Sequence, residues 1–351
     1  MSQRILLEGG ALKRGNSRRL RGLPPLRPKR RRGPWLLLAA LIVLALVVVL
    51  FSAGGSDVRK AHHGARGAAG ARNPTRHATK PRPSLPVYGA TPAPAAERVR
   101  TPFRKYPHSG LLFDLRSGRV LWSYRPQRVL PIASVTKIMT ALLVDERAQP
   151  TDRVLITRTA LSYQGSGVGL LPRGRRVPLT PVLYGMLLPS GNDAAIALAQ
   201  HVGGGSVPRF VNQMNERARA LGLRCSHFVG PDGYDDANRS CPRDLAVLAH
   251  AFLGRPRLAA ISRVPYAALP FPIKGGKLFV ASHNPLMQLR YPGVTGIKTG
   301  FSDAAGLCFV GTARRGRTEL GVVLLNSPQP GAQASQLLNR GFAALRGRAS
   351  A

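Results

Sequence analysis

Acidic residues are scarce in this sequence: 15 Asp and Glu stand against 52 Lys and Arg in 351 residues, which gives a formal net charge of +37. Such an excess of basic residues is typical of proteins that neutralise nucleic-acid phosphates. The basic region is interrupted near the N-terminus by a long apolar stretch, however, which speaks against that class. We therefore expect no specific nucleic-acid partner.

Charged residues are absent from positions 33–56, which read GPWLLLAALIVLALVVVLFSAGGS. About 20 apolar residues suffice to cross a bilayer as a helix. Eight Arg and Lys residues lie in positions 18–32, just before this stretch, and by the positive-inside rule they keep the N-terminus cytoplasmic. The sequence thus predicts a single membrane anchor with the rest of the chain exported. A cleaved signal peptide is the alternative, because small residues occupy positions 52–55.

Apolar periodicity is absent from residues 57–100, which are rich in Pro, Ala, Gly and Arg. Such a segment cannot bury a core, so we expect an extended, disordered linker. The histidines in it lack the spacing of metal ligands, and no metal or other cofactor is expected.

From about residue 101 the sequence becomes typical of a globular domain. GLLFDL and RVLWSY predict a hairpin, the middle of the chain is mostly helical, and GVTGIKTGF, AGLCFVGTAR and TELGVVLLNS predict strands before a closing helix. Strand segments at both ends of a helical middle favour an α+β fold. We expect the first and last strands to share one antiparallel sheet flanked by helices.

Three short groups in this domain carry reactive side chains. SVTK places the Ser134 hydroxyl and the Lys137 amine one turn apart, at the start of an apolar run that predicts a helix over residues 131–146. SGN occupies residues 190–192 and KTG residues 298–300. Singly, the groups are typical of a helix cap, a turn and a strand end. Together they point to a nucleophile with its base.

S-x-x-K, S-D-N and K-T-G are the motif set of class A β-lactamases and penicillin-binding proteins. Longer stretches, including LLPSGNDAAIALA and VTGIKTGFSDAAGLCFVGTARR, extend the similarity over nearly all of residues 105–345. This region resembles the D-alanyl-D-alanine carboxypeptidases, the low-molecular-mass penicillin-binding proteins, in which the second group is usually Ser-Gly-Asn. The resemblance implies a DD-peptidase/β-lactamase-like fold with a helical subdomain, and removal of the terminal D-alanine from peptidoglycan stem peptides. It also implies covalent inhibition by β-lactams.

The resemblance further implies a role for each reactive group. Ser134 would be the nucleophile, Lys137 the base that takes its proton, and Ser190 the relay to the leaving amine. Lys137 accepts a proton only when neutral, so its pKa must fall by about three units, which burial and a neighbouring cation can cause. The backbone N–H groups of Ser134 and Phe301 would form the oxyanion hole.

The other implied residues bind the substrate. Asn192 would hydrogen-bond its peptide backbone. Lys298 and Thr299 would face its terminal carboxylate, and Gly300 would let it approach the strand edge closely.

Cysteine is also scarce, at three residues. Cys225 and Cys241 lie in a segment expected to be exported, where a disulfide between them would contribute about 3 kcal/mol. The alternative, in which the two cysteines are unpaired small residues, stays open. Cys308 is expected to be a buried strand residue.

Rival functions use the same residue types. A D,D-endopeptidase acting on cross-links shares the bond type and the motifs, and the sequence does not choose between the two activities. A class A β-lactamase needs a glutamate ahead of the second group, whereas the single acidic residue between Arg147 and Ser190 is Asp152. A non-catalytic wall-binding or β-lactam-sensing module would be marked by loss of the reactive residues, and all of them are present.

The predicted organisation is a basic cytoplasmic tail (1–32), a transmembrane signal-anchor (33–56), a disordered linker (57–100) and a DD-peptidase catalytic domain (101–346). We expect the protein at the bacterial cell membrane as a single-pass protein, with the catalytic domain on the extracytoplasmic side. Its expected partners are stem peptides, β-lactams as inhibitors, and the membrane through the N-terminal helix.

Overall fold

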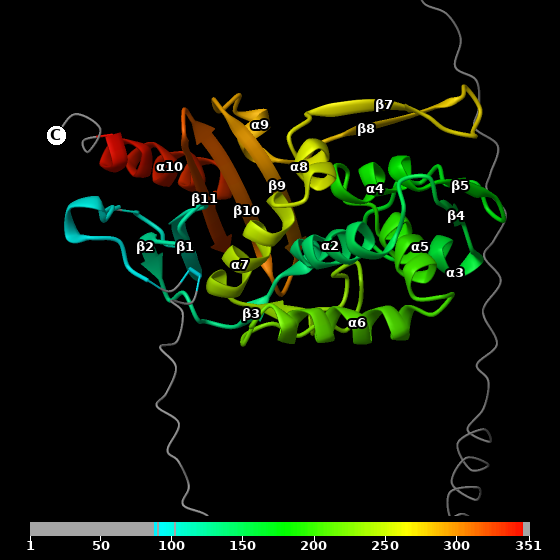
Figure 1. Ribbon diagram of the computed structural model, residues 1–351, viewed down its shortest axis with the longest axis horizontal. Helices are drawn as coiled ribbons and strands as arrows, with labels where there is room; N and C mark the ends of the chain where they lie inside the picture. Colours follow the sequence, from blue (N-terminus) through cyan, green and yellow to red (C-terminus); the bar gives the residue numbers. More distant parts are fainter. Residues whose placement is uncertain (1–87, 90, 102, 347–351) are drawn as a thin grey trace, which may run out of the picture. The chain divides into compact units, whose positions relative to one another are not determined.

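The computed structural model describes residues 88–89, 91–101 and 103–346 (Figure 1). The predicted cytoplasmic tail and membrane anchor, with most of the predicted linker, lie outside the described residues. Among the helices that are described, none has the length and hydropathy required to cross a bilayer.

A five-stranded antiparallel sheet forms the centre of the described region, with strand order β2-β1-β11-β10-β9. The strands are β1 (Ser109–Asp114), β2 (Val120–Tyr124), β9 (Val294–Ser302), β10 (Gly306–Arg315) and β11 (Thr318–Leu325). The first strand therefore pairs with the last, and the predicted α+β arrangement is confirmed. This pairing brings the two ends of the domain together, and β9 becomes an edge of the sheet.

Successive side chains along a strand point to opposite faces of the sheet, and both faces of this sheet are apolar. On β11, Val323 and Leu325 belong to one buried cluster together with Phe113 of β1. The intervening Val322 and Leu324 belong to a second cluster on the opposite face. Both faces must therefore be covered by helices.

Helices cover both faces, as Figure 1 shows. Helix α10 (Pro330–Arg346) packs on β10 and β11 through Leu337, Leu338 and Phe342 of the second cluster. Helix α7 (Pro242–Leu253) packs on β1 and β11, and α8 (Pro256–Ser262) on β9, within the first cluster.

A helical subdomain lies beside the sheet (Figure 1). Its helices are α2 (Lys137–Arg147), α3 (Arg158–Leu161), α4 (Leu179–Leu187), α5 (Asn192–Val202) and α6 (Val207–Ala220). Helix α2 contacts α4, α5, α6, α7 and α8, and all of its residues from 137 to 144 are buried. A helix that is apolar all round is a core helix. The residues at its start are therefore held rigidly.

Shorter elements complete the described region and were not predicted. Three two-stranded sheets pair β3 (Leu130–Pro131) with β6 (Arg239–Ser240), β4 (Arg153–Leu155) with β5 (Arg176–Pro178), and β7 (Tyr266–Pro270) with β8 (Lys277–Ala281). The remaining short helices are η1 (Ala95–Glu97), η2 (Ala133–Thr136) and α9 (Pro285–Gln288).

The predicted linker extends too far toward the C-terminus. Residues 91–100, assigned to it, pack against β2 instead: Ala93 N–H donates to the Val120 oxygen, Val99 N–H donates to the Leu121 oxygen, and both side chains are buried. Sparse apolar residues gave no periodic pattern here, but single side chains are enough to dock a segment on an existing strand. The folded domain thus begins before residue 101.

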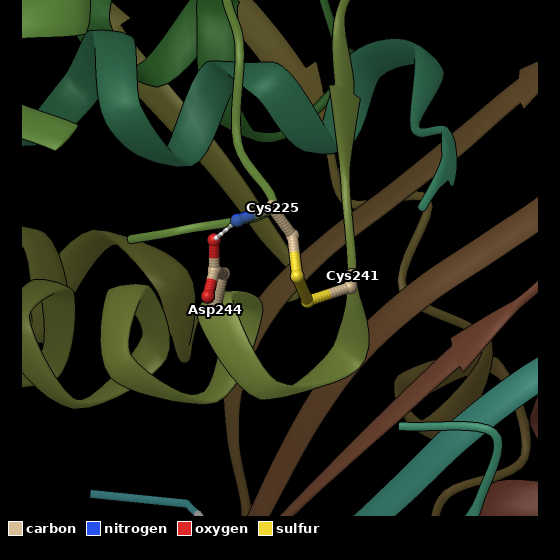
Figure 2. Close-up of side chains that lie close together, drawn as sticks. All are labelled: Cys225, Cys241 and Asp244. Atoms are coloured by element: carbon tan, nitrogen blue, oxygen red, sulfur yellow. Dashed lines mark hydrogen bonds between the residues drawn. A yellow bond between two sulfur atoms is a disulfide. The ribbon is translucent and has the colours of Figure 1, made fainter. Parts of the chain in front are cut away.

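Cys225 and Cys241 form a disulfide with a Cα–Cα distance of 5.6 Å (Figure 2). Asp244, in the first turn of α7, lies beside it and accepts a hydrogen bond from the Cys225 N–H at 2.7 Å. The three side chains are close enough to suggest a metal site. Because the two sulfur atoms are bonded to each other, neither is available as a thiolate ligand.

We predict that replacing both Cys225 and Cys241 by Ser lowers the free energy of unfolding by about 2–4 kcal/mol, because the open loop gains chain entropy when unfolded. Thermal unfolding of the domain should shift downward by roughly 5–10 °C. A reductant should lower the midpoint of the native protein and leave the double variant unchanged. Equal midpoints for the two proteins would contradict the prediction.

Candidate active site

Ser134 lies on η2, a single 3-10 turn that leads into α2. The expected continuous helix over residues 131–146 is therefore divided, and its α-helical part begins at Lys137. Ala133, just before Ser134, has a φ of 45°, in the left-handed region. Such a backbone is costly for a residue with a side chain and persists only where surrounding packing holds it.

Lys137, the first residue of α2, is fully buried and holds the centre of the site. Its Nζ lies 2.9 Å from Ser134 Oγ. The same nitrogen lies 2.6 Å from Asn192 Oδ1 and 2.5 Å from the backbone oxygen of Asp232. The predicted pairing of hydroxyl and amine is therefore present in the geometry, with two further oxygen partners around the amine.

Burial lowers the pKa of Lys137 from its ordinary value to about 7, although the carboxylates of Asp232 and Asp193 oppose this shift. Desolvation dominates because the ammonium form loses its water in the interior. Near neutral pH a large share of Lys137 is uncharged. A neutral amine at hydrogen-bond distance from a serine hydroxyl can accept its proton.

Ser190 and Asn192 lie where α4 ends and α5 begins. Ser190 has a φ of 70°, a second strained position in the site. A Cβ on Gly191 would lie 2.7 Å from a methyl group of Val168 and 3.0 Å from the Gly185 oxygen. Packing therefore requires glycine at the centre of this group and explains why it reads SGN here.

Asn192 and its neighbour Asp193 fix the loop that faces the site. Asn192 Nδ2 donates to the Gln164 oxygen at 2.5 Å. The buried Asp193 carboxylate accepts from the N–H groups of Val168 and Gly169 at 2.8 and 2.9 Å. The Asn192 amide is thus engaged with Lys137 on one side and the loop on the other. In this geometry it positions the base, in addition to the predicted contact with substrate.

Lys298 lies on the edge strand β9 and is almost completely buried, with its Nζ donating to the Thr299 oxygen at 3.0 Å. Burial, followed by the positive charge of Lys137, holds the pKa of Lys298 well below its usual range. A Cβ on Gly300 would lie 2.7 Å from the Ile132 oxygen and 3.0 Å from the Ser134 nitrogen. The absence of a side chain at Gly300 thus lets β9 pack against the segment that carries Ser134.

Two cavities meet at Ser134. A smaller one of about 310 Å³ is also lined by Ser190, Thr299 and Gly300. A larger one of about 800 Å³ is also lined by Asn192. Phe301, whose side chain is 66% exposed, lines both. Most of the predicted site residues thus converge around Ser134, whereas the buried Lys137 and Lys298 line neither cavity.

Sequence reasoning missed the loop between Cys225 and Cys241, which forms one wall of the site. Its backbone oxygens at Pro231 and Asp232 accept hydrogen bonds from Thr140 and Lys137, each at 2.5 Å. A backbone oxygen carries no side-chain signal, so no motif search could find it. Gly233 is a partial signal, since a Cβ there would collide with the Ala133 oxygen.

Comparison with known proteins agrees with this geometry. Residues 98–329 match the family model described as D-alanyl-D-alanine carboxypeptidase. The chain is 36% identical over 243 residues to a D-alanyl-D-alanine carboxypeptidase of Mycobacterium tuberculosis, covering 66% of this chain and 81% of that one. It is 33% identical over 247 residues to a D-alanyl-D-alanine endopeptidase of Pseudomonas aeruginosa, covering 70% and 79%.

The fold is similar to that of the Streptomyces K15 DD-transpeptidase crystal structure, with a TM-score of 0.65 and 30% identity. That match covers 70% of this chain and all of the other. Fold, matched length and residue identity lead to one conclusion: this chain belongs to the D-alanyl-D-alanine carboxypeptidase family of serine hydrolases.

Proposed function

We propose that the protein removes the terminal D-alanine of peptidoglycan stem peptides through an acyl-enzyme on Ser134. The observation that carries this proposal is the 2.9 Å contact between Ser134 Oγ and the buried amine of Lys137, whose pKa is near 7. An exposed lysine would stay protonated at neutral pH and could not accept the hydroxyl proton.

Acylation follows from the positions of these groups. Ser134 Oγ attacks the carbonyl carbon of the penultimate D-alanine while its proton passes to Lys137 Nζ. The developing oxyanion accepts hydrogen bonds from the Ser134 and Phe301 N–H groups. As the peptide C–N bond breaks, Ser190 relays a proton to the leaving amine of D-alanine. Water then cleaves the ester and regenerates Ser134.

The leaving residue ends in a carboxylate, and the smaller cavity is the part of the site suited to it. Thr299 lines this cavity, and Lys298 lies behind it on the same strand. A carboxylate arriving there favours the charged form of Lys298. Binding of the substrate carboxylate and protonation of Lys298 are therefore coupled.

Rapid release of a penicilloyl group is not expected of this site. Asp152, the acidic residue ahead of the second motif, pairs with His201 at 2.9 Å and lines neither cavity at Ser134. Among the described residues, the carboxylates that line the larger cavity belong to Asp235, Asp236 and Asp303, which all follow the second motif, whereas the activating glutamate of class A β-lactamases precedes it. β-Lactams should consequently remain attached to Ser134 as inhibitors.

A D,D-endopeptidase activity on cross-links is the second candidate, favoured by the similarity to the Pseudomonas aeruginosa endopeptidase. Tyr234, which is 56% exposed, lines the larger cavity of about 800 Å³ at Ser134, on the side where a second strand of substrate would have to lie. Incubation with a linear pentapeptide and with a cross-linked dimer separates the two activities. Faster turnover of the dimer would make the endopeptidase the main activity.

We predict that Ser134→Ala abolishes both covalent labelling by penicillin and release of D-alanine, because Ser134 Oγ is the hydroxyl that hydrogen-bonds Lys137 Nζ among the described residues. The loss should approach the roughly 10⁶-fold typical of removing a catalytic serine. The exposed strand residue Ser123 offers a matched control, and Ser123→Ala should label like the native protein. Labelling of a folded Ser134→Ala protein at the native rate would overturn the acyl-enzyme assignment.

The acylation rate should rise with pH through about 7, because Lys137 acts as a base only after losing its proton. Below that pH the ammonium form accumulates and labelling slows. Lys137→Ala should lower the rate by about 10²–10⁴-fold and remove this rise. Measurement of penicillin labelling between about pH 5 and 9 tests this. A native rate that falls as the pH rises through 7 would contradict it.

We further propose that residues 33–56 anchor the chain in the bacterial membrane, with the tail inside and the catalytic domain outside. The uncharged length and the preceding basic residues support this topology. A linker over the remaining thirty or so residues ahead of the folded domain would, if flexible, span about 30 Å and would let the domain reach substrate away from the bilayer.

N-terminal sequencing of protein from the membrane fraction should find the chain starting ahead of residue 33. Protease added outside spheroplasts should digest the catalytic domain and leave the tail protected. A mature start near Gly54, with the activity in the soluble fraction, would instead establish a cleaved signal peptide.

A further inference from the structure

Residues 225–241, which form the loop closed by the disulfide, supply backbone oxygens to the start of helix α2. The Asp232 oxygen accepts a hydrogen bond from Lys137 Nζ at 2.5 Å. The preceding oxygen, of Pro231, accepts one from Thr140 Oγ1 at 2.5 Å. Thr140 lies one turn after Lys137 on α2, and both side chains are buried. The position of the Lys137 amine therefore depends on the position of this loop.

The same loop holds the turn that carries Ser134. Gly233 has a φ of 75°, and a Cβ there would collide with the Ala133 oxygen and lie 2.9 Å from Thr136 Oγ1. The backbone of the loop thus packs directly on η2, with no side chain between them. Ser134 Oγ itself lies 3.5 Å from the Asp232 oxygen. A shift of the loop would therefore release both the nucleophile and its base.

Little regular structure stabilises the disulfide-closed loop from within. Among the described residues, its one helix or strand is β6, which is two residues long. The Asn238 side chain closes a turn of the loop, because its Oδ1 accepts hydrogen bonds from the N–H groups of Val229 and Gly230. A segment with so few ladder hydrogen bonds opens locally at low cost unless its ends are fixed.

Other elements of the domain also contact the loop. Asp236 accepts a hydrogen bond from Ser302 Oγ of β9 at 2.6 Å. Asn215 of α6 bonds both backbone groups of Phe228 through its side chain. These contacts do not depend on the disulfide. We therefore expect the loop to loosen, and not to unfold completely, when the disulfide is opened.

The disulfide fastens the two ends of the loop to helix α7 (Figure 2). Cys241 is the fully buried N-cap residue of α7, and the S–S bond joins it to Cys225. Asp244, in the first turn of α7, accepts hydrogen bonds from the Cys225 N–H at 2.7 Å and from Ser226 Oγ at 2.9 Å. Because α7 packs on β1 and β11, the loop is anchored to the central sheet.

We propose that the disulfide positions the Asp232 oxygen beside Lys137 and that its reduction slows acylation of Ser134. The inference rests on the proposed function, because it takes Ser134 to be the nucleophile that is acylated. The two cysteines line neither cavity at Ser134, so they are positioning residues. Full activity then requires oxidising surroundings, such as those outside a cell membrane.

Reduction requires a thiol reagent from the surroundings, and a dithiol is the probe used here. One dithiol supplies two electrons and two protons: its thiolate attacks a sulfur of the disulfide, the S–S bond breaks, and the reagent closes into its own cyclic disulfide while both cysteines become thiols. Attack begins at the partly exposed Cys225, since Cys241 is completely buried. The Asp244 carboxylate lies within 4.8 Å of both sulfur atoms and repels a thiolate, so reduction should be gradual.

Opening of the loop changes the charge of Lys137 in a defined direction. Burial is the largest influence on the pKa of Lys137 and lowers it to about 7, whereas Asp232 of the loop and Asp193 of α5 raise it. Lys298 on β9 is the charged neighbour from the sheet. Water that enters beside Lys137 removes part of the effect of burial, and the pKa of Lys137 then rises. The neutral base becomes scarcer near neutral pH, and acylation slows.

The test measures penicillin labelling of the full-length protein between about pH 5 and 9, before and after reduction by dithiothreitol. Near pH 7 the reduced protein should label about tenfold more slowly, and its rate should rise at a pH about one unit higher, because a tenfold change in the neutral fraction of the base corresponds to one pH unit. Reoxidation should restore the native rate. Mass spectrometry after alkylation counts the cysteines that reduction has opened.

Two variants separate position from stability when all proteins are measured below their unfolding midpoints. Cys225→Ser combined with Cys241→Ser should label slowly without reductant and should not respond to it. Leu320→Ala creates a cavity in the buried cluster on the other face of the sheet and should lower the unfolding midpoint comparably. Leu320 lines neither cavity at Ser134, so this variant should label like the native protein at every pH.

The outcomes that overturn the proposal are specific. A native rate and an unchanged pH profile in the reduced protein would overturn the positioning role, even if the double variant does not fold. An equal loss in Leu320→Ala would overturn it too, since the effect would then follow from stability alone. If the oxidised native protein neither reacts with penicillin nor releases D-alanine, the proposed function itself is wrong.

Discussion

The burial of Lys137 is the constraint on which the rest of the site depends. Its amine is enclosed by Ser134 Oγ, Asn192 Oδ1 and the Asp232 oxygen, all within 2.9 Å. Burying an amine is unfavourable unless oxygen acceptors surround it, and even then its protonated form is disfavoured. These acceptors satisfy the N–H groups, and the lack of water lowers the pKa to about 7. One arrangement therefore provides both the position and the basicity of the group.

Each acceptor comes from a distant part of the chain, so the base exists only in the folded domain. Asn192 is 55 residues from Lys137 in sequence and Asp232 is 95 residues away. The positive φ values of Ala133 and Ser190 add about 1–3 kcal/mol of strain each to the same region. The densely packed helix α2 and the disulfide-closed loop offset this cost with apolar burial and fixed geometry. Stability elsewhere in the domain thus maintains an unfavourable but reactive centre.

The sequence was sufficient for the parts of this structure that depend on side-chain patterns. Alternating apolar residues located β1, β2 and the three C-terminal strands, and their shared sheet followed from the order of elements. The motif residues Ser134, Ser190 and Thr299 were identifiable because the three short groups, in this order and with their flanking stretches, resemble those of the carboxypeptidase family. The features that the sequence did not predict depend on backbone atoms or on isolated side-chain contacts. The Asp232 oxygen has no side-chain signature, and residues 91–100 dock on β2 through single side chains without a periodic pattern.

The two buried lysines connect recognition to chemistry in the proposed reaction. Burial, followed by the positive charge of Lys137, holds the pKa of Lys298 below its usual range. A carboxylate on the Thr299 side stabilises a proton on Lys298, the lysine on that strand, more than one on Lys137. The proton then resides on Lys298, and Lys137 is neutral beside Ser134. In the proposed reaction, a bound free-acid peptide would thus favour the protonation state that its own cleavage requires, whereas an amide in the same cavity would not.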